Sequence, residues 1–299
     1  MPSPAHGASA AIEAIRTLAL VGPSAAGKTS LAEALLHRSG AVVTPGSLER
    51  GSTVSDFDPL ERRMQHSLNS AVMHLDHAGT RIHLIDTPGG ADFLGQSLPA
   101  LEAVETAAIV VNAATGIEPM AVRMMDYAAA RHLDRLIVVN RIDAAPEQLP
   151  TLLEQIRATF GTECLPLNLP DAGGTKVVDC FYNREGHSDF GSVDAAHRAL
   201  VEQVVEVDAA FVDRYLNDGD VDAAELHAPL EQALREGHLI PVCFVSAKTG
   251  AGVAELLDVI VKLLPNPTEG NAPDFLNGEG AAAVPMHAKP DASLHVLAH

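Results

Sequence analysis

Short apolar runs alternate with longer amphipathic segments along most of the chain. The apolar runs at 17–21, 82–85, 109–112, 136–140 and 240–246 predict buried strands. The amphipathic segments at 28–38, 119–132, 146–160 and 253–264 predict helices. Because continuous apolar strands that alternate with helices form a sheet covered on both faces, the pattern predicts an α/β fold with a mostly parallel sheet.

Three segments break this alternation. Residues 40–70 are polar and rich in turn formers, which predicts a long mobile loop. Within residues 144–239, strand-like pieces near 165–169 and 177–182 precede an acidic helix over about 193–217, so we expect an inserted α+β subdomain at about 161–239. Pro, Gly and Ala dominate after Pro265, and residues 292–299 resemble the start of a strand. The expected organisation is a flexible stretch at 1–15, one domain at 16–268, and a linker with the start of a truncated second domain at 269–299.

Residues 22–29 read GPSAAGKT and fit the pattern G-x-x-x-x-G-K-[S/T] between a predicted strand and a predicted helix. The two glycines permit a turn whose N–H groups face an anion, and the start of the helix adds a partial positive charge. We expect Lys28 to reach the outer phosphates of a nucleotide and to serve catalysis, and the Thr29 hydroxyl to bind Mg²⁺. The predicted phosphate-binding residues are Gly22, Pro23, Ser24, Ala25, Ala26, Gly27, Lys28 and Thr29.

A second turn follows the strand in IHLIDTPGG, residues 82–90. Asp86 then lies at the sheet edge beside the phosphate turn, where its carboxylate can hold Mg²⁺ through a water molecule. Gly89 can bring a backbone N–H to a terminal phosphate, so it is a second catalytic candidate. The same letters also favour an ordinary turn, but their position after a phosphate turn favours nucleotide contact by Asp86, Thr87, Pro88, Gly89 and Gly90.

Two further motifs, LIVVNRID at 136–143 and FVSAK at 244–248, end predicted strands. Asp143 can accept two hydrogen bonds from guanine N1–H and its exocyclic amine, a donor pair that adenine lacks. Asn140 can brace the loop, the Ala247 N–H can donate to guanine O6, and Lys248 can lie over the ring. The predicted base-binding residues are Asn140, Arg141, Asp143, Ser246, Ala247 and Lys248.

Together these four motifs resemble a GTPase of the translation-factor class. The stretches LPLNLPDAGGTKVVD, VEQVVEVDAAFVDRYLNDGD and HLIPVCFVSAKTGAGVAELLDVIVKLLPNP look like the insertion and closing strand–helix of elongation factor G, and the loop SDFDPLERRMQHSLNSA is similar to its elongation factor G-like paralogues. The resemblance covers about residues 16–268.

This resemblance implies the P-loop NTPase fold, with a β-barrel as the domain that starts within 269–299. It implies GTP, GDP and Mg²⁺ as cofactors, and GTP hydrolysis coupled to the ribosome, with the stalk and large-subunit RNA as contacts, in translation elongation and translocation. Ser67 occupies the position of a threonine that completes the Mg²⁺ shell, so Thr29, Ser67 and Asp86 form the implied metal set.

The chain departs from the family pattern at three positions. Gly90 stands where a histidine usually orients the attacking water, Ala25 where Asp is common, and Arg141 where Lys is usual. A glycine has no side chain to position water, so the loss removes a source of transition-state stabilisation. A GTP-dependent regulatory switch with little or no hydrolysis is therefore the alternative function.

Composition narrows the partners and the compartment. The formal net charge of -19 argues against a broad grip on nucleic acid or an anionic membrane, and we expect no sequence-specific DNA partner. No apolar run is long enough to span a bilayer, and the N-terminal residues do not resemble a secretory signal, so we expect a cytoplasmic monomer. Three separated cysteines predict neither disulfides nor a zinc site.

Two other classes of protein fit the sequence less well. A metabolic or membrane-remodelling GTPase would lack the long insertion. A dinucleotide-binding oxidoreductase would need G-x-G-x-x-G after the first strand, and this chain has no such motif there.

Overall fold

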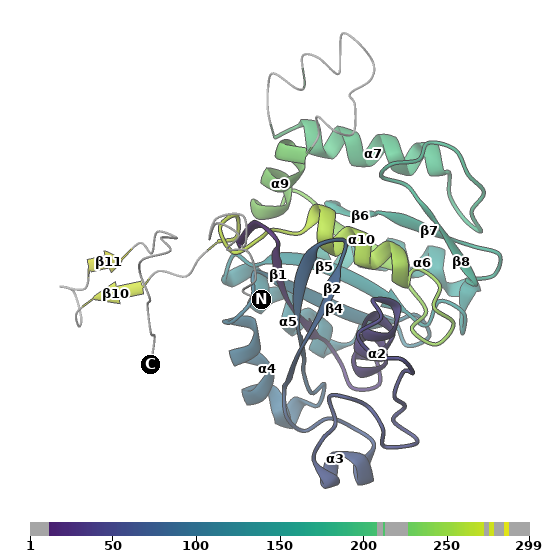
Figure 1. Ribbon diagram of the computed structural model, residues 1–299. Helices are drawn as coiled ribbons and strands as arrows, with labels where there is room; N and C mark the ends of the chain where they lie inside the picture. Colours follow the sequence, from purple (N-terminus) through teal and green to yellow (C-terminus); the bar gives the residue numbers. More distant parts are fainter. Residues whose placement is uncertain (1–11, 208–211, 213–226, 272–274, 278–283, 287–299) are drawn as a thin grey trace, which may run out of the picture.

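A seven-stranded sheet forms the centre of the computed structural model, which describes residues 12–207, 212, 227–271, 275–277 and 284–286 (Figure 1). The strand order is β2-β3-β1-β4-β5-β9-β6. The bounds are β1 (Ile15–Val21), β2 (Ala71–His77), β3 (Thr80–Asp86), β4 (Thr106–Asn112), β5 (Asp134–Asn140), β6 (Cys164–Pro166) and β9 (Ile240–Phe244). Only β2 pairs antiparallel with its neighbour in this sheet, so the predicted mostly parallel α/β fold is confirmed.

Helices cover both faces of the sheet (Figure 1). One face carries α2 (Lys28–Arg38) and α10 (Val253–Leu263), and the other carries α4 (Leu94–Leu101), α5 (Pro119–Ala130) and α6 (Leu149–Phe160). Successive residues of β4 point to opposite faces of the sheet. Ala108 and Val110 pack on the face that α2 covers, and Ile109 and Val111 pack on the face that α5 covers. A strand buried in this way on both faces reads as a continuous apolar run.

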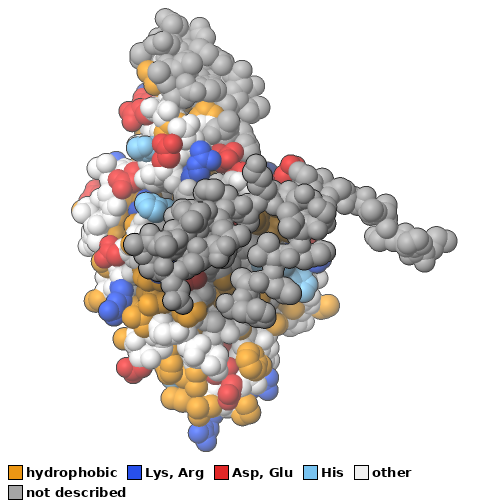
Figure 2. Space-filling view, turned by 90° about the vertical axis from the view of Figure 1, so that its left-hand side faces the viewer, with side chains coloured by type: hydrophobic (Ala, Val, Ile, Leu, Met, Phe, Trp, Pro, Cys, Tyr) orange, Lys and Arg blue, Asp and Glu red, His pale blue; other side chains and the backbone are white. Residues whose placement is uncertain are grey.

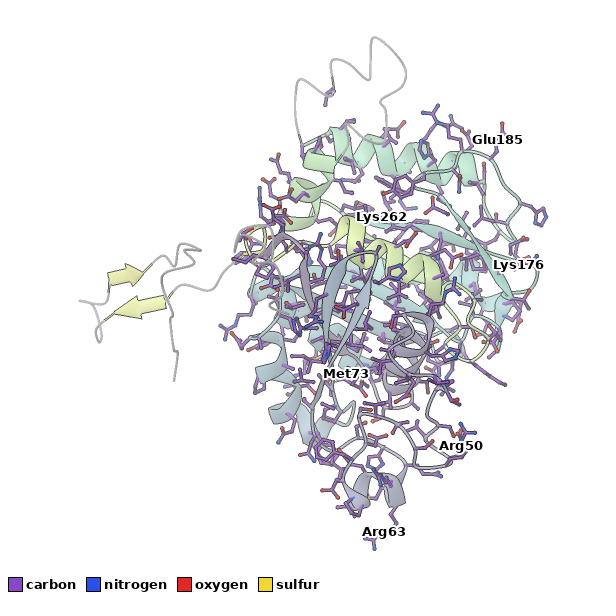
Figure 3. The ribbon with its side chains drawn as sticks, viewed as in Figure 1. Arg50, Arg63, Met73, Lys176, Glu185 and Lys262 are labelled. Atoms are coloured by element: carbon purple, nitrogen blue, oxygen red, sulfur yellow. The ribbon has the colours of Figure 1, made fainter. Side chains whose placement is uncertain are left out.

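The insertion lies between α6 and β9. It contains the antiparallel pair β7 (Asn168–Asp171) and β8 (Lys176–Asp179), followed by α7 (Val193–Val205) and α9 (His227–Arg235). In Figure 3, Lys176 and Glu185 mark its outer side. The preceding strand β6 pairs with β9 and forms an edge of the main sheet. The helix expected over 193–217 ends at Val205 as α7, and the described chain then omits 208–211 and 213–226.

Several elements lie where the sequence pattern predicted none, among them α4, β2 and a short helix within the segment 40–70. Strand β2 alternates, with Ala71, Met73 and Leu75 buried and Val72 exposed, as expected of an edge strand with one covered face. Within the segment 40–70 the structure has a short helix, α3 (Pro59–Met64), instead of an uninterrupted loop. A reciprocal capping box between Asp58 and Glu61 starts this helix.

The last described residues form a short antiparallel pair, β10 (Phe275–Asn277) with β11 (Val284–Met286). The strand expected at 292–299 and residues 1–11 of the expected flexible start lie outside the described residues. Every helix within the described ranges is too short or too polar to cross a bilayer.

Asp134, at the start of β5, is a buried carboxylate that costs stability. It is 2% exposed, and neither of its carboxylate oxygens has a hydrogen-bond partner among the described residues. Burial raises the pKa of Asp134 to about 7. Because the pKa is higher in the folded state than in the unfolded state, the cost is full above pH 7 and disappears as pH falls towards 3.8, the ordinary value.

We therefore expect Asp134→Asn to raise the free energy of unfolding at pH 8 by about 1 to 3 kcal/mol. Urea unfolding of both proteins at pH 8, 6 and 4 checks this. The advantage of the variant should shrink with falling pH, and a pH-independent difference would show that ionisation of Asp134 is not its cause.

Candidate functional site

The site lies where the parallel strands end, because β1, β3, β4, β5 and β9 bring their carboxyl ends to one edge of the sheet. The turn between β1 and α2 requires glycine at both of its ends. Gly22 has φ 133°, and a Cβ there would lie 2.5 Å from the Val110 carbonyl oxygen. Gly27 has φ 90°, and a Cβ there would lie 2.5 Å from Nδ2 of Asn140. Both the backbone angles and the lack of space exclude a side chain.

Lys28 lies beneath this turn and is 6% exposed. Its Nζ donates hydrogen bonds to the carbonyl oxygens of Gly22 at 3.0 Å and Pro23 at 2.9 Å. Burial lowers the pKa of Lys28 to about 8, although Asp86 and Glu118 oppose that shift. A phosphate bound at the turn would supply the negative charge that this desolvated ammonium lacks.

Hydroxyl and carboxylate oxygens gather at the start of α2. The Thr29 hydroxyl donates to Asp86 Oδ2 at 2.6 Å and lies 3.2 Å from the Ser67 hydroxyl, which donates to Asp56 Oδ1 at 2.7 Å. Asp86 is 1% exposed, and burial raises its pKa to about 6. Its Oδ1 atom has no hydrogen-bond partner within the described residues.

This cluster fits a magnesium ion. Mg²⁺ prefers oxygen ligands, and the unpaired, buried Oδ1 of Asp86 is an atom that a cation would satisfy. Across the described ranges no three His, Cys, Asp or Glu side chains are grouped to hold a metal. The remaining ligands would therefore come from hydroxyls, water and a bound phosphate.

Asp56 and Glu61 are contributors that the sequence analysis missed. Asp56 accepts hydrogen bonds from Ser67 and, at 2.9 Å, from Thr53. Glu61 is 1% exposed, and its Oε1 accepts the N–H groups of Leu68 and of the next residue, both at 2.9 Å. The two carboxylates thus hold the segment around Ser67 in place. The sequence signal for Glu61 was D-P-x-E at 58–61, a capping box with a proline at the first helical position, and Asp56 had no such signal.

Asn140 connects the two halves of the site. Its Nδ2 donates to the carbonyl oxygens of Ala26 at 3.1 Å and Gly27 at 3.3 Å, within the phosphate turn. Its Oδ1 accepts the N–H of Ala247 at 3.0 Å. One buried side chain therefore fixes the separation between the phosphate turn and the loop that carries S-A-K.

A cavity of about 760 Å³ opens beside these loops. Asp143 lines it, and its Oδ1 accepts a hydrogen bond of 2.6 Å from the Ser246 hydroxyl. Arg141 and Lys248 line the same cavity and are exposed. The wall opposite these loops comes from α2 and residues 45–49, which Glu33 holds by accepting the N–H of Gly46 at 2.7 Å. The size suits a nucleoside.

The D-T-P-G-G turn at 86–90 packs directly against the phosphate turn at 22–29. Thr87 donates to the Leu20 carbonyl at 2.7 Å, which ties the turn to β1. A Cβ on Gly89 would lie 2.5 Å from Nζ of Lys28, so Gly89 contacts the phosphate turn closely, and Pro88 accepts a hydrogen bond from Ser97. Gly90 precedes a short 3-10 helix, η1 (Ala91–Phe93), and presents no side chain to the site.

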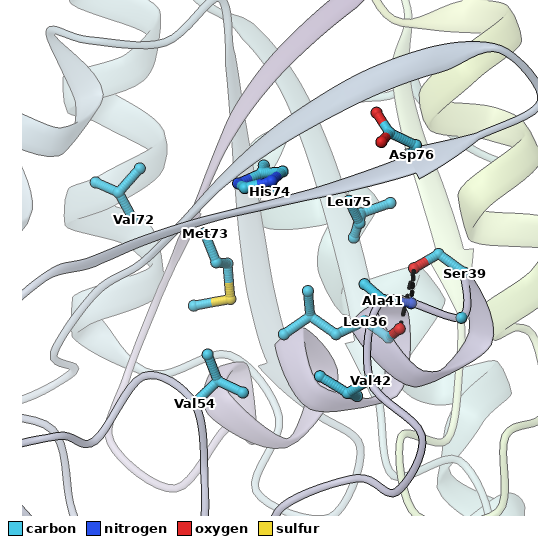
Figure 4. Close-up of a pocket in the computed structure, with 11 residues that line it drawn as sticks. Leu36, Ser39, Ala41, Val42, Val54, Val72, Met73, His74, Leu75 and Asp76 are labelled. Carbon is cyan, nitrogen blue, oxygen red and sulfur yellow. Dashed lines mark hydrogen bonds between the residues drawn. The ribbon is translucent and has the colours of Figure 1, made fainter.

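A second cavity, of about 610 Å³, lies between β2 and the far end of α2 (Figure 4). Leu36, Val54 and Met73 contribute apolar side chains to it. It lies at the opposite end of α2 from Lys28 and is separate from the phosphate turn.

Hydrophobic side chains are exposed at the lower end of Figure 2, the level at which Figure 1 shows α3. Arg50 and Arg63 project there in Figure 3. Within residues 40–72 the exposed large hydrophobic residues are Val43, Val54, Phe57, Leu60, Met64 and Val72.

Comparison with known proteins places these motifs in a family. The family described as "Elongation factor Tu GTP binding domain" matches residues 13–266. An elongation factor G-like protein of Mycobacterium tuberculosis (strain ATCC 25618 / H37Rv) is 32% identical over 94% of this chain and 41% of its own length. Peptide chain release factor 3 of Streptococcus pyogenes serotype M1 is 30% identical over 87% of this chain and 53% of its own length. This chain therefore spans about half the length of these relatives.

A crystal structure of a protein from Thermus thermophilus shares 33% sequence identity, with a TM-score of 0.78 over 86% of this chain and 41% of that chain. The agreement extends from the sequence motifs to the fold that positions them. The chain belongs to the translational GTPases, and its residues 13–266 match the GTP-binding domain of that family.

Proposed function

We propose that this chain binds GTP and GDP together with Mg²⁺, and that it hydrolyses GTP to GDP and phosphate in the cytoplasm, coupled to the ribosome during translation elongation and translocation. The observation that carries the proposal is the Asn140 side chain, which is bonded both to the phosphate turn and to the S-A-K loop. It sets a phosphate subsite and a base subsite at a fixed distance, as a nucleoside triphosphate requires.

In this proposal the N–H groups of the phosphate turn and the start of α2 bind the phosphates, and Lys28 supplies a positive charge to the outer two. Thr29, Ser67 and Asp86 would hold Mg²⁺, which when bound neutralises charge on the phosphate oxygens. Asp143 accepts the two guanine donors, Ala247 donates to guanine O6, and the Arg141 and Lys248 side chains close over the base.

Hydrolysis is an in-line attack by a water molecule on the γ-phosphorus, with GDP leaving and the proton of water ending on the released phosphate. Lys28 and the Gly89 N–H stabilise the charge on the transferred group. Since Gly90 offers no group to orient the water, the rate of GTP hydrolysis without ribosomes should be low. The ribosome would supply a group that orients the attacking water.

Single-turnover phosphate release with and without purified ribosomes tests this function. We expect ribosomes to accelerate release by at least about 10-fold, the scale expected when one catalytic group is supplied in trans. Tight GTP binding without acceleration would reject ribosome-coupled hydrolysis and favour the regulatory switch.

The metal assignment gives a separate prediction for Ser67→Ala. Removing this hydroxyl should weaken Mg²⁺ binding in the complex with a non-hydrolysable GTP analogue by about 10-fold, because one oxygen ligand is lost. A Mg²⁺ titration of nucleotide release measures it. Ser70→Ala is the matched control, since Ser70 is bonded to the Gln96 carbonyl, outside the site. Equal Mg²⁺ dependence in the two variants would remove Ser67 from the metal site.

A further inference from the structure

We propose that the β7–β8 hairpin of the insertion is a brace that holds the two base-recognition loops, and that Gly174 and Asn168 are positioning residues for Asp143 and Ser246. The proposal rests on the guanine site proposed above. It adds that guanine affinity and selectivity depend on a segment that lies outside the four nucleotide motifs.

The first contact joins the tip of the hairpin to the loop that carries Asp143. Gly174 is buried, and a Cβ there would lie 2.4 Å from the carbonyl oxygen of Ile142 and 3.2 Å from the amide nitrogen of Asp143. The hairpin backbone thus packs directly on the Ile142–Asp143 peptide. Because backbone atoms meet here, neither side can adjust by a change of side-chain rotamer.

The shape of the hairpin tip is fixed from within the insertion. Asp189 Oδ2 accepts the N–H groups of Gly173 at 2.9 Å and Gly174 at 3.2 Å. The Asp189 N–H donates to the Pro170 carbonyl at 2.8 Å, which ties this residue to β7. The tip therefore has its own support, and it can act as a rigid body against Ile142.

The second contact joins the base of the hairpin to the strand before S-A-K. Asn168 is 3% exposed and binds both backbone groups of Phe244: its Nδ2 donates to the carbonyl at 3.2 Å, and its Oδ1 accepts the N–H at 2.7 Å. The ring of Phe190, also from the insertion, meets the Phe244 ring edge-on at 5.8 Å. Phe244 is two residues before Ser246, whose hydroxyl binds Asp143.

The two contacts converge on one carboxylate. The hairpin tip supports the backbone of Asp143, and the hairpin base supports the strand that delivers the Ser246 hydroxyl to it. A displacement of the hairpin would therefore shift Asp143 relative to the base, and hydrogen bonds to guanine depend steeply on such shifts.

Two neighbouring glycines provide a matched test. Gly174 and Gly173 have similar positive φ, 73° and 68°, but a Cβ on Gly173 would meet nothing within 4 Å. Gly174→Ala should weaken GDP binding by at least about 10-fold and reduce the ratio of GDP affinity to IDP affinity. IDP is the probe because it lacks the exocyclic amine that would donate a hydrogen bond to Asp143. Gly173→Ala carries the same backbone strain and should leave both affinities within about 2-fold of the parent. Equal effects of the two variants, or an unchanged GDP-to-IDP ratio in Gly174→Ala, would overturn the brace.

Variants of Asp189 and hydrogen exchange of residues 140–146 test the brace independently of whether Gly174→Ala folds. If Gly174→Ala does not fold, Asp189→Ala takes its place: it should shift the GDP-to-IDP ratio in the same direction, and Asp189→Asn, which keeps an acceptor oxygen, should restore it. Hydrogen exchange of residues 140–146 in the nucleotide-free protein should accelerate in Gly174→Ala and not in Gly173→Ala. Unchanged exchange would overturn the brace. A parent protein that does not prefer GDP to IDP would instead refute the guanine site and leave the exchange result to decide on the brace.

Discussion

Replacing Asp143 by Asn should lower the affinity for GDP by about 100- to 1,000-fold and raise the affinity for XDP above that of the parent. In the proposed complex the carboxylate would accept hydrogen bonds from guanine N1–H and the exocyclic amine. An amide presents one acceptor and one donor, which match xanthine N1–H and its 2-oxo group. The Ser246 hydroxyl bonds to Oδ1 of Asp143 at 2.6 Å, and the amide oxygen of Asn can accept the same bond, so the loop should keep its shape.

Calorimetric titration of GDP and XDP into both proteins measures this exchange of preference. Asp126→Asn removes an exposed carboxylate from α5 and serves as the control, with no expected change in either affinity. If Asp143→Asn keeps the parental ratio of GDP to XDP affinity, the carboxylate does not contact the base.

The second large effect concerns hydrolysis. Gly90→His should raise the single-turnover rate of GTP hydrolysis without ribosomes by about 10- to 100-fold, because an imidazole can position the attacking water. The backbone accepts the change, since Gly90 has φ −74° and ψ 141°, angles open to any residue. The new Cβ would lie 3.0 Å from Cδ2 of Phe93, a ring that must move by a few tenths of an ångström.

Phosphate release at saturating GTP gives the rate. Gly90→Ala is the control, because it adds the same Cβ and the same contact with Phe93 but no imidazole. Equal rates in the two variants would mean that this position does not act on the water.

The parallel strands could be predicted from sequence because burial on both faces leaves a continuous apolar run, as in β4. Strand β2 could not be found by the same criterion, since its alternation reflects one covered face. The short helix α3 depends on a capping box between Asp58 and Glu61, a local signal that a count of apolar residues does not detect.

The candidate site likewise contains residues that a sequence pattern marks and residues that only the fold brings together. Glycine spacing and one lysine mark the phosphate turn in the sequence, and the structure brings Thr29, Ser67 and Asp86 together as a local group. Asp56 could not be predicted, because its partner Ser67 is eleven residues away and only the folded loop joins them. The contact between Gly174 and Ile142 is likewise tertiary and leaves no pattern in the sequence.

If these loops form one site for a guanine nucleotide, GTP should compete for the protein far better than ATP. Titrating each nucleotide with Mg²⁺ into the nucleotide-free protein should show GTP bound at least about 100-fold more tightly than ATP, because adenine would leave the half-buried carboxylate of Asp143 without its two donors. Equal affinity for GTP and ATP, or binding of neither nucleotide, would refute the guanine site.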